Sequence, residues 1–310
     1  MMRHFLAIRD VSADELGALL DLARELKAEW RAGGNRPVLQ GKALGMIFQK
    51  PSLRTRVSFD MAMLHLGGHA LYLSPNEIQL GARESTPDVA RVLSRYVQAI
   101  MARVFAHGDV EQLAEHSRVP VINGLSDFEH PCQALADLLT IREKRGQLAG
   151  LKFAYLGDGN NVCQSLLFAG GKAGMHMAVA TPPGFEPRAD VIEQARAEAA
   201  RHGGSVAVTH DPHAAADGAD VLYTDVWTSM GQETEREKRL AIFPPFQINQ
   251  ALVARASPDA VILHCLPAHR GEEITDDVLD GAQSAVFDQA ENRLHAQKAI
   301  LVKLMAGDIP

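Results

Sequence analysis

Residues 48–60, FQKPSLRTRVSFD, mark the point at which an apolar strand gives way to a helix. The apolar run Ala43–Phe48 predicts the strand, and Ser52 is a typical N-cap residue for the helix that follows. A helix N-terminus presents unpaired backbone N–H groups and the positive end of the helix dipole, so it attracts anions. Arg54 and Arg56 oppose that dipole unless an anion binds there. The stretch therefore predicts an anion site, with a capped surface helix carrying solvated arginines as the plainer alternative.

The same strand-then-helix order repeats along the rest of the chain. Further apolar strands are predicted at 69–73, 99–105, 119–122, 152–156, 176–180, 206–208, 220–224 and 260–263. Strands that alternate with helices indicate parallel sheets covered on both faces, so we expect an α/β protein with two doubly wound parallel-sheet domains joined by interdomain helices. Ligands of such sheets bind outside the carboxyl ends of the strands.

Length and a glycine-flanked segment predict where the domains divide. The chain has 310 residues, more than one hydrophobic core usually serves, and Gly146–Gly150 separates two runs of the strand–helix pattern. We expect residues 1–146 to form one domain, completed by a C-terminal helix at 288–310, and residues 147–287 to form the other.

Composition excludes several classes of partner. A formal net charge of -7 and a pI near 6.0 leave no broad basic surface, so nucleic acid is not an expected partner. No stretch approaches the roughly 20 apolar residues of a membrane span. Cys132, Cys163 and Cys265 are isolated from one another and form neither a disulfide framework nor a Cys-x-x-Cys metal motif. These features predict a cytoplasmic protein that binds no membrane.

In the first half of the chain, one predicted strand contains an arginine, and one predicted helix has polar residues at its N-terminal end. Arg103 lies in the apolar run 99–105, where an arginine usually reaches solvent from a strand end; the alternative is that it points into a cleft. Pro131 suits the first position of a helix over 131–145. That helix places His130 and Gln133 at its N-terminal end, where an anion or a carbonyl oxygen could bind.

Two strand ends in the second half precede residues suited to an amino acid. The turn Gly157-Asp-Gly-Asn-Asn161 lacks the third glycine of a dinucleotide-binding motif, and no acidic residue ends the next strand. Its asparagines either only form the turn or hold the polar head of an amino acid. Asp225, which follows the strand 220–224, could hold an amine, and Ser229 could bond a carboxylate or an ammonium group.

A third strand end carries the segment His264-Cys-Leu-Pro-Ala-His269. A structural zinc site usually needs four ligands, and the sequence lacks a second cysteine or histidine cluster. A cysteine protease pair with Cys265 as nucleophile lacks an identifiable base. We therefore expect no metal here.

Four motifs together resemble the aspartate/ornithine carbamoyltransferase family. They are Ser52-Leu-Arg-Thr-Arg56, His130-Pro-Cys-Gln133, Asp225-Val-Trp-Thr-Ser-Met-Gly231 and His264-Cys-Leu-Pro267, in the family's order and at about its spacing. The resemblance covers nearly the whole chain, and the last two motifs are similar to those of members that use ornithine. It implies that the first domain binds carbamoyl phosphate, that the second binds L-ornithine, and that the carbamoyl group passes to the side-chain amine, giving L-citrulline and phosphate in arginine metabolism.

The resemblance also assigns residues to these roles. For carbamoyl phosphate it implies Ser52, Leu53, Arg54, Thr55, Gln79, Arg103, His130, Gln133, Leu266 and Arg293. For ornithine it implies Asn161, Asp225, Ser229, Met230, Cys265 and Leu266. Cys265, Asp225, Arg103 and His130 are the expected catalytic residues.

Three further expectations follow from the family. No metal or organic cofactor is required. Gln79 matches a residue that a neighbouring subunit contributes to the phosphate site, so we expect a homotrimer, or a multiple of it, with active sites at subunit interfaces. The Leu266–Pro267 peptide is expected to be cis, a form found almost only before proline.

Two positions depart from the commonest pattern of the ornithine enzymes. Leu53 stands where threonine is common, and Gln49 where glutamate is frequent; Pro51-Ser52-Leu53 also occurs in relatives that act on N-acylated ornithine. Carbamoyl transfer to N-acylated ornithine or to putrescine therefore stays open as an alternative. So does a non-catalytic small-molecule sensor with the same fold, although Arg54, Arg103, His130 and Cys265 are all present.

Overall fold

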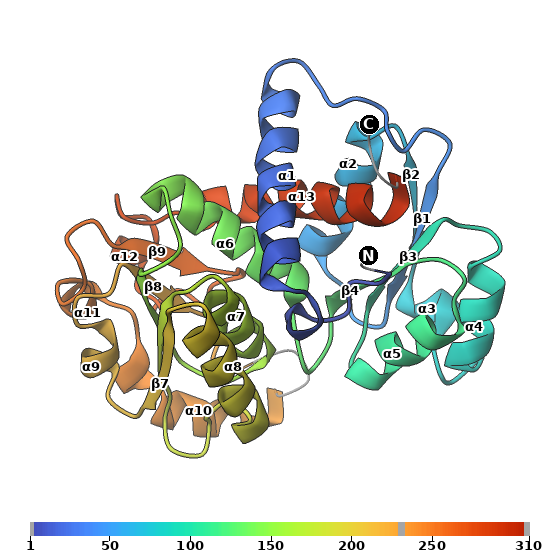
Figure 1. The fold of residues 1–310 in the computed structure, drawn as a ribbon. Helices are drawn as coiled ribbons and strands as arrows, with labels where there is room; N and C mark the ends of the chain where they lie inside the picture. Colours follow the sequence, from blue (N-terminus) through green and yellow to red (C-terminus); the bar gives the residue numbers. More distant parts are fainter. Residues whose placement is uncertain (1–2, 229–232, 307–310) are drawn as a thin grey trace. The chain divides into compact units, whose positions relative to one another are not determined.

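The computed structural model describes residues 3–228 and 233–306 (Figure 1). The chain forms two compact units: unit 1 contains Met1–Ala136 and Glu291–Pro310, and unit 2 contains Asp137–Ala290. Both boundaries fall inside helices, α6 (Pro131–Arg145) and α13 (Val286–Leu301).

Unit 1 contains a four-stranded parallel sheet in the order β2-β1-β3-β4. Its strands are β1 (Ala43–Phe48), β2 (His69–Leu73), β3 (Ala99–Arg103) and β4 (Val121–Leu125). The chain extends the sheet in one direction from β1 to β2 and in the other from β3 to β4, so the order reverses between β1 and β3. In open parallel sheets this reversal leaves a crevice at the carboxyl ends of the two strands, where ligands bind.

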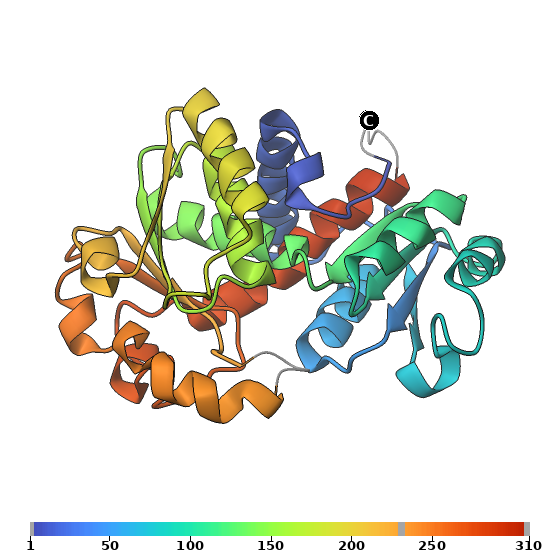
Figure 2. The ribbon, with the colours of Figure 1, turned by 90° about the horizontal axis from the view of Figure 1, so that it is seen from below.

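Helices cover both faces of this sheet (Figures 1 and 2). They are α1 (Ala13–Arg31), α2 (Leu53–His65), α3 (Pro75–Ile78), α4 (Thr86–Leu93) and α5 (His107–His116); the unit also has a 3-10 turn at Ile8–Asp10 and a π-helical turn at Val302–Ala306. Helices α4 and α5 bury Val89, Val110 and Leu113 against Ile47 and Ile100 of the strands. Burial of this apolar surface stabilises the helix–sheet packing, because each strand presents alternate residues to that face.

Unit 2 contains a five-stranded parallel sheet in the order β7-β6-β5-β8-β9. Its strands are β5 (Lys152–Leu156), β6 (His176–Ala180), β7 (Ser205–Thr209), β8 (Val221–Thr224) and β9 (Val261–His264). Its helices, besides the parts of α6 and α13, are α7 (Asn161–Lys172), α8 (Ala189–Arg201), α9 (Pro212–Ala216), α10 (Arg236–Ile242), α11 (Gln250–Val253) and α12 (Asp276–Leu279), with 3-10 turns at Glu233–Glu235 and Pro244–Phe246. The strand order reverses between β5 and β8, which places the expected ligand crevice of this sheet there.

The predicted fold class is therefore confirmed: both units are parallel sheets flanked by helices. The predicted strands 43–48, 69–73, 152–156 and 176–180 have the observed bounds. The other five predicted strands differ from the observed ones by one to three residues at one or both ends. Between β2 and α4 lies the short helix α3, where Ser74 and Glu77 form a capping box. Strand β4 begins at Val121, because the Ser117 hydroxyl bonds both backbone groups of Val119 and forms a turn there instead.

A buried lysine in unit 1 makes stability depend on pH. Lys298 is fully buried, its Nζ donates a hydrogen bond of 2.5 Å to Asn35 Oδ1, and it lies 4.8 Å from the centroid of the Trp30 ring. Burial lowers its pKa from 10.5 to about 8, although the Glu29 carboxylate acts the other way. Between these two pH values the unfolded chain binds the proton that the folded chain has lost, so stability rises with pH.

We expect the free energy of unfolding of the wild type to rise by about 2 kcal/mol, relative to Lys298→Met, between pH 7.5 and pH 9.5. Urea unfolding of both proteins at the two pH values measures this, and the variant corrects for every other group that titrates in the range. A difference between the two proteins that is the same at both pH values would contradict the lowered pKa.

Candidate active site

The N-terminus of α2 lies at the β1–β3 reversal of unit 1. Phe48, the last residue of β1, pairs with Arg103, the last residue of β3. Ser52 is the N-cap residue, as predicted, and its hydroxyl accepts a bond of 3.3 Å from the backbone N–H of Thr55. The first turn of α2 contains no acidic residue. Its helix dipole is therefore uncompensated by an acidic side chain of that turn and favours an anion.

Arg293 is brought into this region from the C-terminal part of the chain. Its Nη2 donates a hydrogen bond of 2.9 Å to Thr55 Oγ1, and its Nη1 donates to Gln133 Oε1. The same Nη1 lies 3.5 Å from His130 Nε2. All four side chains are buried, as is Arg103. Predicted residues from three distant parts of the sequence thus meet in unit 1.

His130 is held neutral in this cluster. Its pKa is lowered well below 6.5, first by burial and then by the positive charges of Arg293, Arg103 and Arg54. The positive charges of all three arginines therefore act at His130. A neutral imidazole can donate a hydrogen bond to a carbonyl oxygen, and the surrounding guanidinium groups favour a bound anion. Because Arg103 is buried, the alternative that it reaches solvent from a strand end was wrong.

The two unusual positions near α2 have separate explanations. Gln49 Nε2 donates a bond of 3.0 Å to Asp109, and its Oε1 accepts a bond of 2.7 Å from the backbone N–H of Phe105. A glutamate could not donate to Asp109, so glutamine suits this place. Leu53 is the first residue of α2 and its side chain is 76% exposed. Its backbone N–H belongs to the helix N-terminus whatever the side chain.

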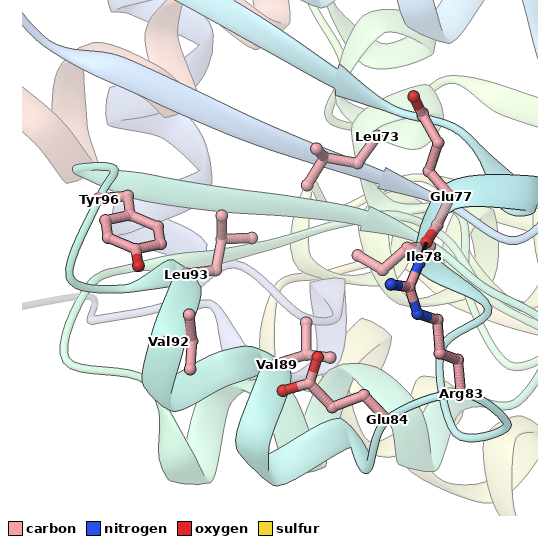
Figure 3. Close-up of a pocket in the computed structure, with 9 residues that line it drawn as sticks. All are labelled: Leu73, Glu77, Ile78, Arg83, Glu84, Val89, Val92, Leu93 and Tyr96. Carbon is pink, nitrogen blue, oxygen red and sulfur yellow. Dashed lines mark hydrogen bonds between the residues drawn. The ribbon is translucent and has the colours of Figure 1, made fainter.

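Gln79 lies away from these residues, on the loop before α4. It is exposed and has a left-handed backbone conformation with φ of 40°. Beside it is a cavity of about 290 Å³, which Figure 3 shows between α4, the end of β2 and this loop. The cavity is lined by Leu73, Glu77, Ile78, Arg83, Glu84, Val89, Val92, Leu93 and Tyr96. Val92 and Tyr96 are exposed.

In unit 2, the β5–β8 reversal carries a carboxylate and a thiol. Asp225 follows β8 directly and is buried. Its Oδ1 accepts bonds of 2.8 Å from Cys265 Sγ, at the end of β9, and from the backbone N–H of Val226. Two strand ends that are far apart in the sequence therefore bring the predicted Asp225 and Cys265 into contact.

The segment after β9 is fixed by a buried contact between His264 and Glu273 that no sequence motif indicated. His264 Nε2 lies 2.9 Å from Glu273 Oε1, both side chains being fully buried, and His264 Nδ1 accepts a bond of 2.8 Å from the Leu266 backbone N–H. The Leu266–Pro267 peptide is cis, as predicted, and Leu266 has φ of 57°. A leucine in this left-handed region is strained, and such strain persists where the surrounding structure imposes it.

Two other residues of unit 2 were not among the assigned site residues. Asn160, which precedes the predicted Asn161, donates a bond of 2.8 Å from Nδ2 to Asp225 Oδ2. Arg239 is buried, and its Nη1 donates bonds of 2.7 Å to Asp158 and to the backbone oxygen of Trp227. Asn160 belongs to the turn Gly157–Asn161 that the sequence analysis singled out, whereas no sequence motif marked Arg239. The predicted Ser229 and Met230 lie outside the described residues.

Within the described part of the chain, two groups of side chains have ligand atoms close enough together to hold a metal ion. They are Asp225, His264 and Cys265, and His269, Glu272 and Glu273. Both ring nitrogens of His264 already have partners, and Asp225 accepts bonds on both oxygens. Glu272 forms an ion pair with Arg236. A metal would have to displace these contacts. Within the same described ranges, no helix is long and apolar enough to cross a membrane.

The fold places the chain among α/β proteins with parallel sheets, whose ligands bind where the strand order reverses, and the arginine charges near His130 suit an anionic ligand. Comparison with protein families narrows this class. The carbamoyl-phosphate-binding domain of aspartate/ornithine carbamoyltransferases matches residues 3–143, and the aspartate/ornithine-binding domain of the same family matches residues 149–304. The chain belongs to the aspartate/ornithine carbamoyltransferase family.

Individual relatives are similar over the full length. An anabolic ornithine carbamoyltransferase of Pyrococcus furiosus is 58% identical over 98% of this chain and 97% of its own. The solved structure of ornithine carbamoyltransferase from that organism covers 99% of this chain and 98% of its own, with a TM-score of 0.97. Ornithine carbamoyltransferase from Thermus thermophilus is 49% identical, with a TM-score of 0.89 and coverage of 98% and 99%.

Proposed function

We propose that the protein transfers the carbamoyl group of carbamoyl phosphate to the side-chain amine of L-ornithine, giving L-citrulline and phosphate. The observation that supports this acceptor is the contact between the buried Asp225 and the partly buried Cys265, because a carboxylate beside a thiol suits an amine. Full-length similarity to ornithine carbamoyltransferases supports the same acceptor. In this proposal the domain predicted at 1–146, completed by 288–310, binds carbamoyl phosphate, and 147–287 binds ornithine.

The phosphate is proposed to bind at the N-terminus of α2. Its oxygens would accept bonds from Ser52, from the backbone N–H of Leu53, and from Arg54 and Thr55, with Arg103 close by. Support comes from the absence of an acidic residue in the first turn of α2 and from the three arginine charges that converge on His130. Charge-assisted hydrogen bonds of this kind are among the strongest that side chains form.

The carbamoyl group is proposed to contact His130, Gln133, Arg293 and the backbone of Leu266. When the amine nitrogen bonds to the carbamoyl carbon, negative charge grows on the carbamoyl oxygen, and Thr55, Arg103 and neutral His130 would stabilise it. The bond from that carbon to the phosphate oxygen then breaks, and Arg54 meets the charge of the leaving phosphate. The amine attacks as the neutral base and gives up one proton, which the leaving phosphate takes. This chemistry uses no metal or organic cofactor.

The acceptor is proposed to bind through its two ends. Asp225 and Cys265 would hold the side-chain amine, and Asn161, Ser229 and Met230 the α-amino and α-carboxyl groups. Putrescine has no carboxylate and an N-acylated ornithine has no α-ammonium charge, so each would lose part of this recognition. The P. furiosus relative is named anabolic, and we propose the same biosynthetic direction in arginine metabolism here.

We further propose a cytoplasmic homotrimer, in which Gln79 of one copy completes the phosphate site of the next. Gln79 is exposed on a loop that also borders the cavity of Figure 3. Leu71, Val92 and Tyr96 add exposed apolar surface on β2, α4 and the segment after α4. A neighbouring subunit that covers this surface would remove it from water.

Citrulline formation tests the reaction. Carbamoyl phosphate is offered with L-ornithine, N-acetyl-L-ornithine, N-succinyl-L-ornithine or putrescine in separate assays. We expect turnover with L-ornithine to exceed the others by about 10³-fold or more, because buried polar groups that lose their partner strongly reject an analogue. Turnover only with an N-acylated acceptor would overturn the proposed acceptor, and no turnover with any of the four would favour a sensor.

A further inference from the structure

The turn after β5 places an asparagine amide directly against Asp225. Asn160 is the N-cap residue of α7, and its Oδ1 accepts bonds of 3.0 and 3.2 Å from the backbone N–H groups of Val162 and Cys163. The Tyr155 hydroxyl lies 3.3 Å from the same oxygen. Because the acceptor end of the amide is fixed by the helix, its Nδ2 end can only point the other way. There it donates the 2.8 Å bond to Asp225 Oδ2.

The helix itself does not require an asparagine here. Aspartate and serine are N-cap residues of about the same strength, and each could accept the bonds from Val162 and Cys163. Neither carries an amide donor that could reach Asp225 while its oxygen accepts from the helix. What asparagine adds over both is therefore the hydrogen bond to the carboxylate. A bond to an ionised acceptor is stronger than a bond between neutral groups.

We propose that Asn160 is a positioning residue for the acceptor amine: its amide holds one oxygen of the Asp225 carboxylate, so that the other oxygen faces Cys265. This inference rests on the proposed function, since it assumes that Asp225 binds the amine. Asn160 acts through Asp225 and is assigned no contact with either substrate. The two oxygens of Asp225 then have separate tasks, Oδ2 being anchored by Asn160 and Oδ1 lying beside the thiol.

Two substitutions separate this role from helix capping. Asn160→Asp keeps the shape and the N-cap acceptor but sets a second carboxylate against Asp225, and Asn160→Ser keeps an acceptor and removes the donor without adding charge. We expect kcat/KM for L-ornithine to fall about 100-fold or more in Asn160→Asp and about 10-fold in Asn160→Ser. The KM for carbamoyl phosphate and the melting temperature should stay close to those of the wild type.

The matched control is Asn249→Asp, which changes another asparagine N-cap of unit 2, at the start of α11. It should keep wild-type activity toward L-ornithine. If Asn160→Asp is as active as this control, Asn160 only caps its helix and the inference is wrong. If kcat/KM falls only together with the melting temperature, the loss is structural and the inference is also wrong. If the wild type itself does not use L-ornithine, the proposed function fails, whatever the variants do.

Discussion

Replacing Asp225 by asparagine will lower kcat/KM for L-ornithine by about 10³-fold while carbamoyl phosphate still binds. The two side chains have nearly the same shape, but asparagine lacks the negative charge with which Asp225 is proposed to hold the substrate's amine. Asparagine also fits its surroundings poorly. Asp225 accepts a bond from Val226 N–H on one oxygen and from Asn160 on the other, so an amide NH2 meets a donor in either orientation.

The measurement is steady-state citrulline formation with L-ornithine varied, together with calorimetric titration of carbamoyl phosphate. Asp190→Asn is the matched control, because Asp190 is an exposed aspartate of the same unit that pairs with Arg188. It should leave both quantities unchanged. An Asp225→Asn protein with near wild-type turnover would show that the acceptor binds elsewhere, and one that loses carbamoyl phosphate binding would show that Asp225 does not belong to the acceptor alone.

Replacing Arg54 by alanine should weaken carbamoyl phosphate binding by about 10²-fold and lower turnover with it. Arg54 stands in the first turn of α2, is only partly exposed, and its charge lowers the pKa of the buried His130. The guanidinium group of Arg54 is therefore close enough to His130 to influence it electrostatically. Without it, the phosphate keeps the helix N-terminus and Arg103 but loses a charged donor.

Arg56→Ala tests whether any arginine of that turn would have the same effect. Arg56 is exposed, and its guanidinium carbon lies 4.0 Å above the ring centroid of Tyr72. We expect this variant to bind carbamoyl phosphate as the wild type does. Titration of both variants with carbamoyl phosphate and with inorganic phosphate compares them directly. Equal losses in the two would mean that net charge, and not a defined phosphate contact, holds the anion.

Local sequence patterns predicted most helices and strands, and they predicted which strand ends and helix N-termini carry the candidate site residues. Ser52 caps α2 because its hydroxyl accepts a hydrogen bond from a free backbone N–H of the first turn. Pro131 begins α6 because its ring fixes a helical φ at a position that needs no N–H donor. Both effects depend only on residues near in sequence. Most strands could be located because their apolar runs are buried on both faces of a parallel sheet. A predicted strand bound was wrong where a side chain formed hydrogen bonds with nearby backbone groups, as the Ser117 hydroxyl does with Val119 before β4.

The sequence by itself thus determined a parallel α/β fold and the motifs of a family, and it predicts an anion site at residues 52–55. Only the tertiary structure decided which side chains meet. Strand order places the end of β1 beside that of β3, and the end of β5 beside that of β8, although neither pair is consecutive in the chain. Arg293 reaches Thr55, and Asn160 reaches Asp225. Hydrogen bonds form between atoms a few ångströms apart, and that distance is set by packing over the whole unit, which no local pattern of residues records.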